Sequence, residues 1–95
     1  MKILHNKRRI QRTKRFARDI KKISESVQKE AFQISQKLAD DIFHASLNVC
    51  SMTGLKGIYR VVIKKDYRMI FSFDRENLYL LRIGHRKDIY RKMEL

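Results

Sequence analysis

The spacing of the hydrophobic residues changes halfway along the chain, and this change restricts the folds that the sequence can adopt. Between Phe16 and Ile42 the apolar residues recur at intervals of three and four, which is typical of amphipathic helices. Between Tyr59 and Phe73 they alternate with polar residues, which is typical of half-buried strands. Helices followed by strands predict an α+β domain in which the helices cover one face of a sheet.

The first half of the chain is predicted to contain a helical hairpin. Thr13 has the hydroxyl of a good N-cap, and we expect one helix over residues 14–23 and a second over residues 25–43. Residues 8–12 are a weak candidate for a strand in front of the hairpin. Residues 44–57 contain two glycines and are predicted to form a connection.

The second half predicts three antiparallel strands in a meander, over residues 59–64, 67–73 and 78–84. A short final helix is expected over residues 87–93. We expect the sheet face that points away from the helices to be exposed to solvent. Its basic residues would be Arg60, Lys64 and Arg68.

Charge is the unusual part of the composition. The chain has 95 residues, and this length predicts a single domain over residues 1–95. The net charge is +13, and the basic residues are concentrated in the first 24 residues and in the last 40. Such a field favours a nucleic acid, an acidic protein or an anionic lipid as partner.

Several classes of protein are disfavoured. The single cysteine, Cys50, cannot form an internal disulfide, and no spacing of cysteine and histidine resembles a zinc site. No apolar run approaches the roughly 18 residues of a membrane span, and the N-terminus does not resemble a signal peptide. Three glycines and no proline leave no glycine-rich phosphate loop. We therefore expect a cytoplasmic protein that has no metal or other cofactor and no membrane partner.

Five segments of the chain form a recognisable series, in the order Thr13–Phe16, Asp19–Ile23, Leu55–Arg60, Asp66–Phe71 and Ile83–Arg91. Together they resemble the RelE/ParE superfamily, the small toxins of type II toxin–antitoxin systems. The first two segments resemble the strand-to-helix opening of these toxins, and the other three match in the same order as in the superfamily. The resemblance extends over roughly residues 8–92.

The resemblance carries expectations about fold and function. It implies an N-terminal strand, a helical hairpin, a small antiparallel sheet and a C-terminal helix. RelE-like members cleave mRNA in the ribosomal A site, and this implies a ribosome-dependent endoribonuclease that inhibits translation. ParE-like members poison DNA gyrase, which is the alternative. Both kinds are neutralised by a cognate antitoxin, so a toxin–antitoxin hetero-oligomer is expected. A basic RNA- or DNA-binding module without toxicity is a third interpretation.

The resemblance also assigns candidate catalytic residues. Metal-free RNA cleavage needs a base for the 2′-OH, an acid for the 5′-oxygen, and stabilisation of the charged phosphorane. The arginines and the tyrosine of RelE-like toxins fall on Arg68, Arg86 and Tyr90. Two lysines of the second strand fall on Arg60 and Val62. Arg60 can hold a phosphate but cannot accept a proton, because arginine stays protonated, and valine can do neither.

His85 is the predicted substitute for the missing lysines, because an imidazole can act as base or acid near neutral pH. An ordinary turn histidine with a satisfied hydrogen bond is the alternative. Arg68 and Arg86 are expected to converge without a carboxylate between them, whereas Lys87 is expected to take no part in cleavage. The basic residues predicted to bind RNA phosphates are Arg60, Lys64, Lys56, Arg12, Lys14 and Arg15.

Overall fold

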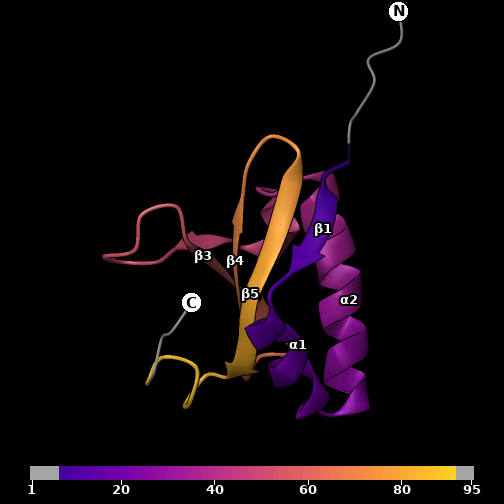
Figure 1. The fold of residues 1–95 in the computed structure, drawn as a ribbon, viewed down its shortest axis with the longest axis vertical. Helices are drawn as coiled ribbons and strands as arrows, with labels where there is room; N and C mark the ends of the chain where they lie inside the picture. Colours follow the sequence, from indigo (N-terminus) through magenta and orange to yellow (C-terminus); the bar gives the residue numbers. More distant parts are fainter. Residues whose placement is uncertain (1–6, 92–95) are drawn as a thin grey trace, which may run out of the picture.

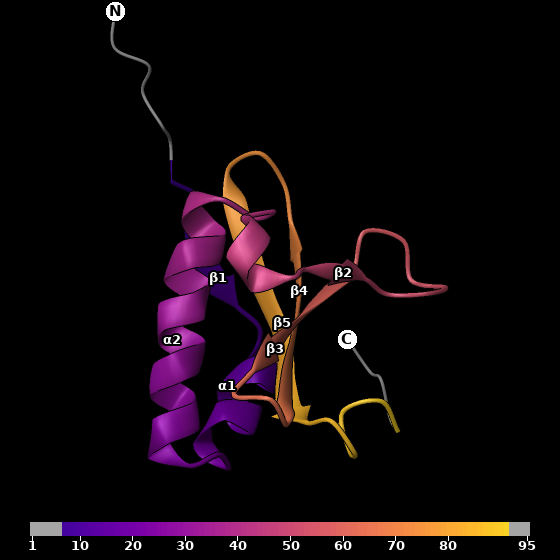
Figure 2. The same ribbon diagram turned by 180° about the vertical axis from the view of Figure 1, so that it is seen from behind.

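The computed structural model of the chain describes residues 7–91. The elements follow in the order β1 (Arg9–Arg12), α1 (Lys14–Lys21), α2 (Glu25–Asp40), the short 3-10 helix η1 (Ala45–Leu47), β2 (Cys50–Ser51), β3 (Tyr59–Ile63), β4 (Tyr67–Phe73) and β5 (Asn77–His85). The helices lie on one side of a twisted sheet (Figure 1). Seen from behind, α2 and the C-terminal turns lie on opposite sides of the strands (Figure 2).

The predicted helical hairpin is confirmed, and its ends have local causes. The Thr13 hydroxyl oxygen accepts a hydrogen bond from the backbone N–H of Phe16 at 3.0 Å, as an N-cap should. The side-chain amide of Gln28 donates to the carbonyls of Ile20 and Ile23, which ties α2 to the end of α1. Helix α2 ends earlier than expected, since the backbone of Asp41 is already extended.

The sheet has the strand order β1-β5-β4-β3-β2. Strands β3, β4 and β5 form the predicted antiparallel meander. The expectation of a wholly antiparallel sheet is wrong, because β1 pairs with β5 in parallel, from Arg9 opposite Asn77 to Arg12 opposite Leu80. Parallel neighbours need a long crossover, and here the helical hairpin and the strands β2, β3 and β4 lie between β1 and β5 in sequence.

Strand β2 was not expected, because it lies inside the predicted connection. It is only two residues long, with Cys50 opposite Arg60 and Ser51 opposite Tyr59. Two residues are too few to show an alternating pattern, so the sequence carries no signal for this strand.

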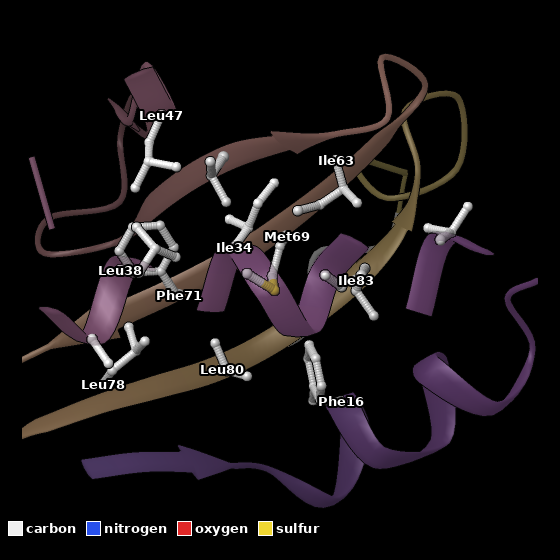
Figure 3. Packing of buried hydrophobic residues seen from close by; sticks show 14 of the residues in the cluster. Phe16, Ile34, Leu38, Leu47, Ile63, Met69, Phe71, Leu78, Leu80 and Ile83 are labelled. Carbon is white, nitrogen blue, oxygen red and sulfur yellow. The ribbon is translucent and has the colours of Figure 1, made fainter. Parts of the chain in front are cut away.

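The core lies between α2 and the inner face of the sheet (Figure 3). Met69 and Phe71 of β4 are fully buried, and Tyr59 and Phe73 pack against the core as partly buried residues. The core residues of α2 recur at helical spacing, which confirms the apolar stripe seen in the sequence. They are Val27, Ala31, Ile34, Leu38 and Ala39. Within residues 7–91 no helix is long and apolar enough to cross a membrane.

The predicted C-terminal helix is wrong for the part of it that the structure describes. Residues 86–91 form hydrogen-bonded turns, and residues 92–93 lie outside the described range. One helical hydrogen bond closes, from the N–H of Ile89 to the carbonyl of His85. A single closed turn does not offset the cost of nucleating a helix. The turns are instead fixed by Ile89, which is buried against Gly84 of β5.

Candidate functional site

The face of the sheet opposite the helices carries an open cavity of about 580 Å³ lined by basic residues. Arg60 of β3 and Arg68 of β4 reach it because alternate residues of a strand share one face. The C-terminal turns complete it, because Ile89 packs where Gly84 has no side chain and holds the turns over the sheet. The charged or aromatic lining residues are Arg60, Arg68, Arg86, Lys87 and Tyr90.

Arg60 and Arg68 do not stand directly opposite one another. In the register of the sheet Arg60 faces Ile70, and Arg68 faces Val62 on one side and Gly84 on the other. The two arginines are therefore diagonal neighbours on one face, which still lets both long side chains reach the cavity. Val62 follows Arg60 by two residues in β3 and is opposite Arg68 in β4. Its side chain is partly exposed, but it does not line the cavity.

Arg68 is held by backbone carbonyls. Its Nη1 atom donates to the carbonyl oxygen of Lys65 at 2.7 Å and to that of Tyr67 at 3.0 Å. Its Nε atom is buried and finds no acceptor in the described part of the chain. A buried donor without a partner needs an explanation. Backbone carbonyls fix the guanidinium in place, and no carboxylate of residues 7–91 pairs with it, which suits it to bind an anion.

Arg86 has a carboxylate beside it, so the expectation that the two arginines meet without one is wrong. The backbone N–H of Arg86 donates to the carbonyl oxygen of Asp66 at 2.8 Å. Its Nε atom lies 3.4 Å from Oδ1 of the same aspartate. Both side chains are about half exposed, and ion pairs of this kind are weak. The pair therefore orients Arg86 more than it neutralises it.

His85 lies on the other face of the sheet from the arginines. Gly84 and His85 are consecutive in β5, so they point to opposite faces. The imidazole packs edge-on against Tyr67, with ring centroids 5.4 Å apart, and its Nδ1 atom accepts from the N–H of Lys87. It lines a separate cavity of about 310 Å³. This is the geometry of the alternative considered above, a turn histidine whose hydrogen bond is satisfied.

Lys87, which was expected to take no part in cleavage, lines the arginine cavity. Alternation along β5 cannot locate it, because the strand ends at His85 and the chain then turns. The cavity therefore joins guanidinium groups, an ammonium and the phenol of Tyr90, and no carboxylate is among its lining residues. Its potential is strongly positive, which favours a phosphate or another anion. In the part of the chain that the structure describes, no group of acidic, histidine or cysteine side chains could hold a metal ion.

The other residues predicted to bind phosphate do not join this cavity. Lys64 belongs to the β3–β4 turn, Lys56 lies in the exposed loop before β3, and Lys14 is the first residue of α1. Arg15 lines a separate polar cavity of about 330 Å³, together with Arg18, Lys22 and Arg82. Arg12 lines a mainly apolar one between α1, α2 and β1. The structure thus distributes these charges over other surfaces.

Comparison with known proteins identifies the fold and the family. A comparison with curated protein sequences gave no match. Among solved structures, the chain superposes on RelE in the RelB–RelE antitoxin–toxin complex from Methanococcus jannaschii with a TM-score of 0.72 and 21% identity, covering 84% of this chain and 94% of that one.

It also superposes on YafQ from Escherichia coli with a TM-score of 0.74 and 16% identity, covering 87% of this chain and 98% of that one. For the YoeB dimer from Staphylococcus aureus the TM-score is 0.74 and the identity 12%, covering 84% and 98%. At these identities the likeness shows a shared fold. The family model described as the ParE toxin of the type II toxin–antitoxin system parDE matches residues 10–90. The chain therefore belongs to the ParE toxin family, in the RelE/ParE superfamily of type II toxins.

Proposed function

We propose that this toxin is a ribosome-dependent, metal-independent endoribonuclease that stops translation by cutting mRNA. The observation that carries the proposal is the convergence of Arg60, Arg68 and Arg86 with Lys87 and Tyr90 around one open cavity. A set of fixed cations next to an aromatic ring suits a single RNA strand, which offers both phosphates and unstacked bases. The net charge of +13 favours the same partner, a ribosome rich in RNA.

The geometry suggests a role for each residue. Arg68 and Arg86 bind the scissile phosphate and stabilise the charge that develops on the phosphorane, while Arg60 holds a neighbouring phosphate. Lys87 is the amine of the cavity, and we assign it the proton that goes to the departing 5′-oxygen. Tyr90, which is 42% exposed, stacks on a base or orients the 2′-OH. The proton of the 2′-OH passes to water in the open cavity, because no imidazole or carboxylate of residues 7–91 lines it. His85 faces away and has no part in this proposal.

Primer extension on a translated mRNA tests the function. The purified toxin should cut the message at defined positions within codons when ribosomes are translating, and should leave the same RNA intact when ribosomes are absent. The variant Arg86→Ala is the matched control, because it removes one cavity side chain that is half exposed. If the translated message stays intact at every toxin concentration, the proposal is wrong.

Inhibition of DNA gyrase is the second candidate, and one observation favours it. The cavity lacks an imidazole or a carboxylate among its lining residues, and a gyrase inhibitor needs neither. The matched family model is also that of a ParE toxin. A gyrase supercoiling assay with the same preparation distinguishes the two functions. Loss of supercoiling with intact translated mRNA would replace the first proposal by this one.

We also propose a cognate antitoxin as the partner in the cell, in a toxin–antitoxin hetero-oligomer. The related RelE from Methanococcus jannaschii was crystallised as an antitoxin–toxin complex. The chain offers an apolar cavity of about 420 Å³ beside Phe32, whose side chain is 65% exposed. Apolar anchors in such a cavity, with acidic residues over the basic surface, suit an antitoxin segment. Co-expression with the neighbouring gene should restore growth, and toxicity that persists would contradict this pairing.

A further inference from the structure

The turn between β3 and β4 has a backbone conformation that its residues disfavour. Lys64 and Lys65 have φ angles of 44° and 67°, although neither is glycine. The N–H of Asp66 donates to the carbonyl oxygen of Lys64 at 2.6 Å, which closes a γ-turn around Lys65. γ-turns with a positive φ are rare and strained. Strain of this kind persists where surrounding contacts impose it, and it is concentrated at functional sites.

The same turn holds both of the arginines assigned to the scissile phosphate. The carbonyl oxygen of Lys65 accepts from Nη1 of Arg68. The carbonyl oxygen of Asp66 accepts from the backbone N–H of Arg86, and its carboxylate faces Nε of that arginine. One three-residue turn therefore connects an arginine of β4 with an arginine of the C-terminal segment, which come from separate parts of the chain.

We propose that Asp66 is a positioning residue that orients Arg86 for the cleavage reaction. The inference rests on the proposed nuclease function. Asp66 is not among the residues that line the cavity, so it acts on the substrate through Arg86. Its carboxylate faces Nε, which leaves the two terminal nitrogens of the guanidinium available for a bidentate contact with phosphate. A long side chain that is already held in place loses less freedom when the transition state forms.

Single-turnover cleavage of a translated mRNA at saturating toxin tests the role. Asp66→Ala should lower the cleavage rate by about 10-fold, since misplacing a group by about 1 Å can cost up to about 10²-fold. The toxin concentration that gives half of the maximal rate should not change. Asp66→Asn keeps an oxygen that can accept from Nε and should recover most of the rate. Asp88→Ala is the matched control, because it removes the same charge from a residue that faces the other cavity.

A double-mutant cycle shows whether Asp66 acts through Arg86. In the Arg86→Ala background, Asp66→Ala should lower the rate no further, because the group that it orients is gone. Additive losses would overturn the inference. A faster rate for Asp66→Ala would also overturn it, since it would mean that the carboxylate only repels RNA.

A measurement on the free protein, without RNA, tests the positioning role separately from the proposed function. In ¹⁵N spectra of the free protein, Asp66→Ala should shift the Nε–H resonance of Arg86 and speed its exchange with water. The Nε–H of Arg82, which is bonded to Asp19, is the internal reference and should not change. If the wild type cuts no RNA, the nuclease proposal fails, but the resonance of Arg86 still shows whether Asp66 orients this side chain. If the wild type cuts and Asp66→Ala matches it, the positioning role fails and the function stands.

Discussion

Two arginines near the end of β5 each face an aspartate, and the two pairs differ in geometry and in exposure. Nε of Arg82 lies 2.7 Å from Oδ2 of Asp19, and both side chains are 12% exposed. Nε of Arg86 lies 3.4 Å from Oδ1 of Asp66, and the side chains of Arg86 and Asp66 are 53% and 47% exposed. The closer, largely buried pair joins α1 to the sheet, whereas the looser pair stands at the edge of the basic cavity. The same two residue types thus serve stability in one place and leave a cation available in the other.

The largest effect on the cleavage rate is expected from Arg86→Ala, which removes the arginine of the exposed pair. Loss of a group that stabilises the transition state lowers the rate by about 10²–10³. An exposed side chain contributes within about 0.5 kcal/mol to folding, so the melting temperature should stay nearly the same. Primer extension and thermal denaturation measure the two quantities. Cleavage at the wild-type rate, or a protein that unfolds, would remove Arg86 from the site.

Asp19→Ala should give the opposite result, because it breaks the largely buried pair. The substitution leaves the guanidinium of Arg82 without this carboxylate and the N–H of Ile83 without an acceptor. The free energy of unfolding should fall by about 3 kcal/mol. Asp66→Ala is the control and should cost at most about 1 kcal/mol. Urea denaturation of both variants checks this, and equal losses would show that burial does not distinguish the two pairs.

Lys87→Ala and His85→Ala compare the two faces of the sheet at its end. Removing the proposed acid should lower the cleavage rate by about 10²-fold. His85→Ala should cleave at nearly the wild-type rate, because the imidazole lies away from the arginines. Both rates are measured on translated mRNA with correction for the folded fraction. A large loss for His85→Ala with little for Lys87→Ala would reverse the assignment.

Lys65→Gly tests the strained turn that contacts Arg68 and Arg86, and it has the smallest expected effect. Glycine adopts a positive φ without a steric penalty, so the free energy of unfolding should rise by up to about 1 kcal/mol. The cleavage rate should hold, because the turn contacts Arg68 through a backbone carbonyl. Lys56→Gly removes the same charge at a position whose φ is not positive and should not stabilise. If Lys65→Gly is less stable than the wild type, the claim that Lys65 strains this turn is wrong.

The sequence predicted the elements whose patterns are long enough to recognise. The stripe of α2 and the alternation of β3 and β4 each extend over several residues, so hairpin and meander were expected correctly. Strand β1 has four residues, mostly exposed, and carries no sign of a parallel partner far along the chain. The pairing with β5 depends on tertiary packing, which local periodicity does not encode.

The candidate site was predicted in part for a similar reason. Arg60, Arg68, Arg86 and Tyr90 were assigned from the resemblance, and the structure brings them to one cavity. That Lys87 lines this cavity while His85 lines another was not predictable, because the strand ends between them and periodicity stops with it. The contact of Ile89 with Gly84 fixes the path of the chain after β5. This contact depends on tertiary packing, which the spacing of residues in the sequence does not predict.

Asp19 also has a consequence for how the protein behaves at high concentration. Beyond Leu80, opposite the last residue of β1, no strand within residues 7–91 pairs with this edge of β5, and the carboxylate of Asp19 accepts the N–H of Ile83 in place of a strand's carbonyl. Unpaired strand edges invite pairing with other chains and lead to aggregates. The carboxylate that holds Arg82 therefore also protects this edge against the addition of a further strand.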